Sequence, residues 1–211
     1  LKIAEGHKKG VNVVKDIVKE SIKQNLSSLT IYAFSSENWK RPKTEVTAIK
    51  KLVVDAINDQ VPELKEQKVR LKFFGHTNDF GKKVIDKIRY AEEKTCIKNS
   101  KLDLNVALGY GGKQDLVDIV KSISANVLDK KIKLNNINEG MLHDASSVPV
   151  KEIDLLIRTG GDKRISNFLL YQIAYAEIIF VKKYWPDFNN KDYLKCLNDF
   201  KKVDRRFGKR S

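Results

Sequence analysis

Short apolar runs alternate with helical patterns along the whole chain. Five of these runs predict β-strands, at residues 29–35, 69–75, 102–110, 154–158 and 177–181. Most of them are continuously apolar rather than alternating, which is expected when both faces of a parallel sheet are covered by other elements. The runs therefore favour a buried, mainly parallel sheet.

Apolar residues between these runs recur every three or four positions, which predicts amphipathic helices. The residues that share a face in each predicted helix are Val11, Val14, Val18 and Ile22; Val46, Ile49, Val53 and Ala56; Phe80, Val84, Ile88 and Ala91; Leu116, Val120, Ile123 and Val127; and Tyr193, Leu197 and Phe200. The polar segment 129–152 predicts a short helix between loops. This alternation is typical of an α/β fold, here a central, mainly parallel sheet flanked by helices in one domain.

The net charge of the chain indicates which classes of partner it could bind. The sequence has 211 residues, of which 41 % are hydrophobic and 32 % charged, and a formal net charge of +14. These fractions are normal for a soluble domain, whereas the positive excess indicates nucleic acid, an anionic membrane surface or phosphorylated substrates. Glycine and aromatic residues are not interleaved with the basic runs, so a single-strand nucleic-acid binder is the weaker hypothesis.

Cysteine and histidine are too dispersed to suggest a metal or disulfide framework. Cys96 and Cys196 form no CxxC pair, and the three histidines lie far apart in the sequence. The longest nearly apolar run, 168–181, contains two polar residues and is too short to span a bilayer, and no signal peptide is visible. We expect a cytoplasmic protein, with a peripheral position at the inner face of the plasma membrane as an open possibility.

The segment 158–166 carries the first candidate chemistry. A predicted strand delivers Arg158 into a Gly-Gly turn, which is followed by Arg164 and Ser166 and then by an amphipathic segment that predicts a helix start. Backbone N–H groups and a helix dipole at such a turn can face an anion, and arginine supplies forked donors for phosphate oxygens. The alternative is an ordinary loop whose arginines pair with Asp154 or Asp162.

Two further strand ends carry polar or glycine-rich strings. The first predicted strand runs into Ser-Ser-Glu-Asn-Trp at 35–39, and the third runs into Gly-Tyr-Gly-Gly at 109–112. Ligands of parallel α/β sheets bind at the carboxyl ends of the strands. We therefore expect the three strand ends to converge on one binding site at one edge of the sheet.

Taken in order, these strings resemble the cis-prenyltransferase family over nearly the whole chain. The matching strings are Gly-His-Lys-Lys-Gly at 6–10, Tyr-Ala-Phe-Ser-Ser-Glu-Asn-Trp-Lys-Arg-Pro at 32–42, Ala-Leu-Gly-Tyr-Gly-Gly at 107–112, Asp-Leu-Leu-Ile-Arg-Thr-Gly-Gly at 154–161, Arg-Ile-Ser-Asn-Phe-Leu-Leu at 164–170, Ala-Tyr-Ala-Glu at 174–177, Trp-Pro-Asp-Phe at 185–188 and Arg-Arg-Phe-Gly at 205–208. Any one string is weak evidence, but the ordered series is specific.

The resemblance implies an activity and an assembly. Members condense isopentenyl diphosphate with an allylic diphosphate, usually farnesyl diphosphate, in the presence of magnesium, and form homodimers around a hydrophobic tunnel. The bacterial type of the strings implies undecaprenyl diphosphate, the precursor of the lipid carrier in cell-wall synthesis. The apolar segment 168–181 is expected to contribute to the two-fold interface.

By the same resemblance, the residues that would hold the diphosphate of isopentenyl diphosphate are Arg158, Arg164 and Ser166, and Ile165 would be a further substrate-binding residue. His7 would bind the allylic diphosphate. The residues that would line the same region are Ser35, Ser36, Glu37, Trp39 and Arg41, although Trp39 is equally suited to a core. Asn38 is the catalytic candidate, and because a neutral amide is a poor base, we expect it to position a group rather than take a proton.

The last three carry-overs concern the metal and the partner chain. Glu177 would be a magnesium ligand, which suits an ion that prefers few carboxylates together with phosphate oxygens. Arg206 and Gly208 match an ending that reaches the partner's diphosphate site.

The chain departs from the family at its start. The family begins with a strand and a Met-Asp-Gly-Asn-Gly-Arg-Trp loop whose aspartate is catalytic, and the sequence 1–211 does not contain this string. We expect a single cis-prenyltransferase domain that lacks this segment in the sequence as written. The alternatives are a non-catalytic partner subunit of a heteromeric enzyme and a basic nucleic-acid-binding domain.

Overall fold

Two parallel sheets form the centre of the protein. The computed structural model of the chain describes residues 3–205, and within them β1 (Ser28–Ser35), β3 (Leu102–Tyr110) and β2 (Val69–Phe74) form one sheet in the order β1-β3-β2. A second sheet pairs β4 (Leu155–Arg158) with β5 (Glu177–Phe180). Every predicted strand is confirmed within one residue at each end. The predicted mainly parallel sheet flanked by helices is confirmed, and within residues 3–205 it consists of two sheets, because β1 and β4 are not paired with each other.

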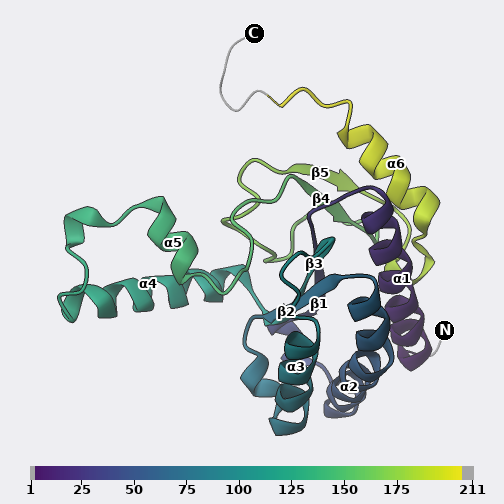
Figure 1. Cartoon of the computed structure of the whole chain (residues 1–211), viewed down its shortest axis with the longest axis horizontal. Helices are drawn as coiled ribbons and strands as arrows, with labels where there is room; N and C mark the ends of the chain where they lie inside the picture. The colour runs from purple at the N-terminus through teal and green to yellow at the C-terminus, as the bar shows by residue number, and fades with distance from the viewer. Residues whose placement is uncertain (1–2, 206–211) are drawn as a thin grey trace.

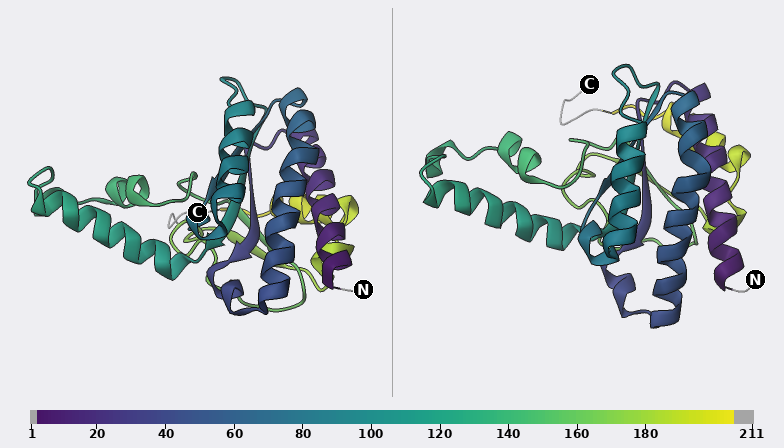
Figure 2. Two further views of the ribbon diagram at one scale, coloured as in Figure 1. Left: turned by 90° about the horizontal axis from the view of Figure 1, so that it is seen from below. Right: turned by 60° about the horizontal axis from the view of Figure 1, so that its bottom comes forward.

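Helices cover these sheets and connect their strands. The helices are α1 (Ile3–Lys23), α2 (Lys43–Glu66), α3 (Lys82–Lys94), α4 (Gly112–Leu128), α5 (Glu139–Ala145) and α6 (Asn190–Phe200), with short 3-10 helices η1 (Ser36–Lys40), η2 (Thr77–Phe80), η3 (Leu134–Asn136) and η4 (Trp185–Asp187). Figures 1 and 2 show α1, α2 and α3 side by side along the three-stranded sheet. Within residues 3–205, none of the helices combines the length and apolarity needed to cross a bilayer.

Strand β3 is buried on both of its faces, which explains its continuous apolar run. Leu104 and Leu108 pack into a core that also contains residues of α2 and α3. Ala107 and Tyr110 belong to a second core with Phe168, from the connection between β4 and β5. The central strand therefore joins the two halves of the molecule, as the prediction of a covered parallel sheet requires.

An arm formed by α4, η3 and α5 projects from the body (Figures 1 and 2). The periodicity predicted α4 correctly, but its predicted apolar face is buried only in part. Val120 is 63 % exposed and Leu116 is 37 % exposed, whereas Ile119 and Ile123 are buried. Because the helix leaves the body, only its inner residues find packing partners, and the outer apolar residues face solvent.

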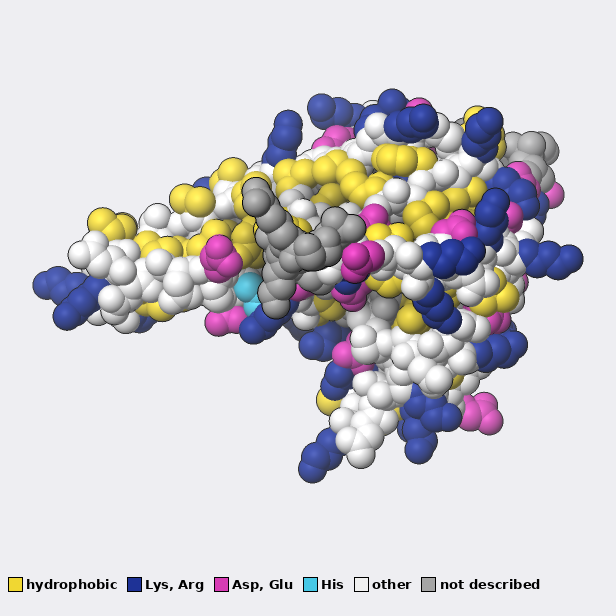
Figure 3. Space-filling view, turned by 90° about the horizontal axis from the view of Figure 1, so that it is seen from above, with side chains coloured by type: hydrophobic (Ala, Val, Ile, Leu, Met, Phe, Trp, Pro, Cys, Tyr) yellow, Lys and Arg dark blue, Asp and Glu magenta, His cyan; other side chains and the backbone are white. Residues whose placement is uncertain are grey.

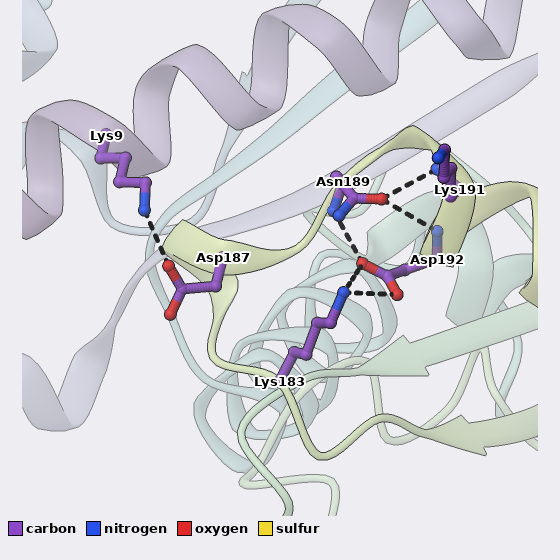
Figure 4. A network of polar contacts seen from close by, with 6 residues as sticks. All are labelled: Lys9, Lys183, Asp187, Asn189, Lys191 and Asp192. Atoms are coloured by element: carbon purple, nitrogen blue, oxygen red, sulfur yellow. Dashed lines mark hydrogen bonds and ion pairs between the residues drawn. The ribbon is translucent and has the colours of Figure 1, made fainter.

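Polar contacts attach the C-terminal part to α1. Asn189 caps α6, and its backbone N–H in turn reaches the Asp192 carboxylate (Figure 4). The Lys183 ammonium lies 2.8 Å from Asp192, and Lys9 of α1 lies 2.7 Å from Asp187 in η4. The Lys9–Asp187 contact joins the segment that follows β5 to the first helix, whereas the contacts of Asp192 lie within that segment.

Candidate functional site

Arg158 lies at the carboxyl end of β4 with part of its guanidinium already engaged. Its Nη1 donates to Ser166 Oγ at 2.6 Å and its Nη2 donates to Asp162 Oδ2 at 3.2 Å. The side chain is only 22 % exposed, and its buried Nε finds no hydrogen-bond partner among the described residues. A buried donor without a partner is costly, so the geometry leaves this arginine prepared for a further acceptor.

Asp162 accepts hydrogen bonds from both arginines of the turn. Arg164, which is 66 % exposed, donates through Nη2 to Asp162 Oδ2 at 2.5 Å, and the same oxygen takes the contact from Arg158. The pairing with Asp162 that the sequence left as an alternative is thus present. An anion that binds here has to replace or share this carboxylate.

The Gly-Gly turn does not present its backbone donors to an anion. Gly160 N–H donates to Lys183 O and Gly161 N–H donates to Val181 O, while both glycines adopt the left-handed region that suits them. The expected helix start after Ser166 is also wrong, because the connection between β4 and β5, which the structure describes in full, contains no helix. The donors of this site are therefore side chains rather than a nest of backbone N–H groups and a helix dipole.

Ser166 and its neighbours adopt an unusual backbone instead of a helix. Ser166, Asn167 and Leu169 have φ of 48°, 61° and 46°. Asparagine tolerates this left-handed region better than other L-residues, whereas serine and leucine enter it at a cost. The turn is thus held in place by contacts made elsewhere in the structure.

The loop after β1 brings Asn38 and Glu37 to the same region. Asn38 Oδ1 accepts a hydrogen bond from the Ser35 N–H at 3.0 Å, so the amide oxygen fixes the loop. Glu37 accepts from Ser36 Oγ and, at 2.7 Å, from Asn167 Nδ2. Burial raises the pKa of the Glu37 carboxyl, but hydrogen bonds, with the Asn167 amide first among them, outweigh it and hold the pKa below its usual value.

His7 and Arg41 form a second basic pair around a shared carboxylate. Glu45 Oε1 accepts from Arg41 Nη1 at 2.8 Å and lies 3.6 Å from His7 Nε2. That distance is beyond hydrogen-bond reach, and within residues 3–205 nothing else bonds the buried His7 Nε2. The ring nitrogen is therefore available to a ligand.

Trp39 supports the loop from below rather than facing the cavity. Its ring packs against Phe34 and Phe80, with centroids 4.9 Å and 4.7 Å away, and the Lys50 ammonium lies 5.1 Å from its centroid. The core role that the sequence allowed for Trp39 is the one that these contacts support.

A cavity of about 1460 Å³ connects these groups. The predicted site residues that line it are His7, Asn38, Arg41, Ile165 and Arg158. Its interior is apolar, and the residues contributed by α2 and the sheet include Ile49, Val53, Ile57, Leu104 and Val106. A polar mouth over a long apolar interior suits an amphiphilic ligand with a charged head and a hydrocarbon chain.

Metal ligands are sparse in this region. Among residues 3–205, no group of three or more histidine, cysteine, aspartate or glutamate side chains could hold a metal ion. Glu177 is the first residue of β5 and pairs with Leu155, so it lies about 10 Å along the sheet from the level of Arg158.

Arg206 and Gly208, which were predicted to reach the partner's diphosphate site, lie outside the described residues.

Asn167 joins the three strand-end loops, and the sequence analysis gave it no role. Its Oδ1 accepts from the Lys113 N–H at 2.8 Å and its backbone oxygen accepts from the Gly112 N–H at 2.8 Å. Its amide nitrogen meets Glu37, as described above. The only available signal was its place beside Ser166 and its tolerance of left-handed backbone.

The chain matches known proteins over nearly its whole length. A family model described as putative undecaprenyl diphosphate synthase matches residues 1–208. The chain is 43 % identical over 204 residues to the ditrans,polycis-undecaprenyl-diphosphate synthase ((2E,6E)-farnesyl-diphosphate specific) of Buchnera aphidicola, and the match covers 96 % of this chain and 81 % of that protein. It is also 43 % identical to the isoprenyl transferase of Clostridium perfringens, covering 96 % of this chain and 80 % of that protein.

Solved structures show the same fold. A crystal structure of lavandulyl diphosphate synthase from Lavandula x intermedia in complex with dimethylallyl diphosphate superposes with a TM-score of 0.95 at 30 % identity, covering 99 % of this chain and 90 % of that one. A probable undecaprenyl diphosphate synthase from Campylobacter jejuni superposes with a TM-score of 0.83 at 33 % identity, covering 96 % and 93 %. The strand-end site thus lies on a fold shared with diphosphate-handling enzymes.

Proposed function

The chain belongs to the undecaprenyl diphosphate synthase family, and on this premise we propose that it condenses isopentenyl diphosphate with farnesyl diphosphate. The product would be a long cis-polyprenyl diphosphate, namely undecaprenyl diphosphate. The observation that carries this proposal is one cavity that is lined by Arg158 from the loop after β4 and by His7 and Arg41 from a second region, and whose other lining residues are mostly apolar. A reaction that joins two diphosphates and lengthens a hydrocarbon chain needs these features.

The two basic sets would hold the two substrates. Arg158, with Ser166 and Arg164, would hold the diphosphate of isopentenyl diphosphate, because forked guanidinium donors and a hydroxyl suit phosphate oxygens. His7 and Arg41 would hold the allylic diphosphate, whose hydrocarbon tail extends into the cavity. In each cycle a carbon–carbon bond forms as the allylic carbon–oxygen bond breaks, diphosphate leaves and the homoallylic partner loses a proton.

Asn38 would position a group rather than take the proton. Its amide oxygen is committed to the Ser35 N–H, and its side chain lines the cavity. A neutral amide cannot serve as an efficient general base, but it can orient the loop that faces the reacting carbons.

Magnesium belongs to this proposal as a partner of the diphosphates. Bound there, it would neutralise phosphate charge and so favour departure of the diphosphate. The described residues supply single carboxylates rather than a cage, which suits an ion that takes most of its ligands from phosphates and water. Glu177 remains the predicted protein ligand.

The net charge of +14 supports loose attachment of the protein to an anionic bilayer, into which an apolar product would be delivered.

The activity can be tested with the full-length protein. Incubation with labelled isopentenyl diphosphate, farnesyl diphosphate and magnesium should give a long, butanol-extractable polyprenyl diphosphate. Arg158→Ala should lower kcat/KM for isopentenyl diphosphate about ten- to hundredfold, the scale of one lost charged hydrogen-bond set. Arg89→Ala removes an exposed arginine of α3 and serves as the charge-matched control. A folded wild-type protein that forms no such product would exclude the proposal.

We also propose a homodimer that uses the arm and the second sheet. The exposed apolar residues of these elements are Leu116, Val117, Val120, Ile178 and Phe180. Figure 3 shows hydrophobic side chains gathered along the projecting arm and over the adjoining body. Part of the segment expected at the interface lies elsewhere, because Phe168, Leu169 and Ile173 are buried in the core.

The dimer predicts a specific response to charge on the arm. Val120→Asp should shift the mass in solution from dimer to monomer, because it places a carboxylate in an apolar contact. Ser122→Asp adds the same charge to another, exposed face of α4 and should leave the mass unchanged. Light scattering coupled to size exclusion measures both. A wild-type monomer at micromolar concentration would contradict the proposal.

A further inference from the structure

One asparagine connects all three strand-end loops. Asn167 binds Glu37 of the loop after β1, Lys113 and Gly112 after β3, and sits beside Ser166 of the loop after β4. These partners are 130 and 54 residues away in sequence for Glu37 and Lys113. Its contacts therefore fix the relative positions of segments that no local interaction links.

Asn167 also acts as a cap for a helix to which it does not belong. The first residues of α4 have N–H groups without intrahelical partners, and the helix is preceded by Gly111, which has no side chain to cap them. The Gly112 N–H is satisfied by the Asn167 carbonyl and the Lys113 N–H by its side-chain oxygen. The start of α4 is thus held against the turn that contains Ser166.

The junction is packed closely enough that only glycine fits at its centre. A Cβ built on Gly111 would lie 2.4 Å from Ser36 Oγ and 2.8 Å from Asn167 Nδ2. One built on Gly112 would lie 2.6 Å from Leu170 Cγ. Close packing of the three loops means that a displacement of one loop is passed to the others.

The turn that this junction holds is the one that positions Arg158. Ser166 accepts from Arg158 Nη1 and has a φ of 48°, a conformation that serine does not adopt without support. Asn167, with a φ of 61°, is the adjacent residue and carries the external hydrogen bonds. The support for the strained serine therefore comes through its neighbour.

We propose that Asn167 is a positioning residue, which holds Ser166 and Arg158 in diphosphate-binding geometry and couples them to the Glu37 loop. This inference rests on the proposed function for the identity of the ligand. It predicts that loss of the Asn167 side chain, whose hydrogen bonds go to Glu37 and Lys113, weakens diphosphate binding at the Arg158 turn.

Two substitutions separate the effect of the Asn167 side-chain hydrogen bonds from the effect of its backbone conformation. Asn167→Gly removes the hydrogen bonds but accepts the left-handed conformation, whereas Asn167→Ala adds backbone strain. Asn167→Gly should raise KM for isopentenyl diphosphate about tenfold, with a smaller change in KM for the allylic substrate and in kcat. Deuterium exchange of the Lys113 amide should accelerate in the same variant, because its acceptor is lost.

A reciprocal exchange supplies the rescue. In the double variant Glu37→Gln with Asn167→Asp, the amide of residue 37 becomes the donor and the carboxylate of residue 167 becomes the acceptor. This carboxylate can still accept a hydrogen bond from the Lys113 N–H. The double variant should bind inorganic pyrophosphate more tightly than Asn167→Asp alone, in which two carboxylates face each other. If the contact with Glu37 plays no part in binding, the double variant should lose as much pyrophosphate affinity as Asn167→Asp alone.

The measurements keep this inference separate from the proposed function. Prenyl transfer by the wild-type protein tests the function, whereas titration with inorganic pyrophosphate compares the folded variants with the wild type directly. Pyrophosphate affinity of Asn167→Gly within twofold of the wild type would overturn the positioning role, even if prenyl transfer is confirmed. Absence of pyrophosphate binding by the wild type would overturn both.

Discussion

At the scale of residues, the candidate diphosphate site includes a carboxylate, Asp162, that competes with a diphosphate for the two arginines. Asp162 Oδ2 lies within ion-pair distance of both Arg158 and Arg164, so both guanidinium groups are paired with this one carboxylate. The carboxylate is 45 % exposed and Arg164 is 66 % exposed, so solvent screens this pairing and each contact contributes little. A diphosphate, with more charge and more acceptors than one carboxylate, is expected to displace Asp162.

This competition predicts the effect of neutralising Asp162. Asp162→Asn should tighten pyrophosphate binding about two- to fivefold, because the ligand no longer has to displace an ion pair. The gain in binding free energy is below about 1.4 kcal/mol, since the ion pair is partly exposed and therefore weak. Isothermal titration measures the change, with Asp199→Asn on α6, whose ion-pair partner is the neighbouring Lys202, as the matched control. Weaker binding by Asp162→Asn would show instead that the carboxylate organises the two arginines for the ligand.

Residue type and position were enough to predict an arginine site, but not the contacts that support it. Arg158, Arg164 and Ser166 could be predicted because guanidinium and hydroxyl donors beside a Gly-Gly turn are suited to phosphate. The role of Asn167 could not, because it depends on contacts with Glu37 and Lys113 that only the folded chain creates. An asparagine next to a serine is too common to single out by itself.

At the scale of elements, strands were easier to predict than the faces of helices. The continuous runs located all five strands, because burial on both faces demands apolar residues throughout. The helical period likewise located α4, but it could not show that the helix leaves the body and exposes Val120. Which stripe of a helix is buried depends on the packing of the neighbouring elements, and the period contains no information on that packing.

The expected helix after Ser166 failed for a related reason. The segment 166–176 has apolar residues at helical spacing, yet Phe168, Leu169 and Ile173 enter the second core from a chain of turns. The contacts of Asn167 with α4 and with Glu37 compete with a local helix and prevail. Tertiary contacts thus override a propensity that is weak over so short a segment.

At the scale of the whole molecule, the edge strands β1 and β4 of the two sheets border the same cavity. Within residues 3–205, β1 is paired only with β3, and β4 is paired only with β5. The cavity is lined by residues 27–33 around β1 and by residues 153–160 around β4. Both free edges therefore border one space, and backbone groups at a buried edge require partners. A parallel strand between β1 and β4 would join the two sheets into the single sheet that the sequence predicted.

The strand that the family resemblance places ahead of the His7 segment suits this position, and its effect can be measured. In a chain extended by this strand and the Met-Asp-Gly-Asn loop, we expect amides of β1 and β4 to exchange at least about tenfold more slowly than in the 211-residue chain. The amides of β3, which is paired on both sides in either case, serve as the internal reference. Such a strand would also bring its aspartate loop to the carboxyl ends of β1 and β4, where Asn38 and Arg158 lie. Equal exchange of β1 and β4 in both chains would show that the strand binds elsewhere and that the cavity belongs to the substrates alone.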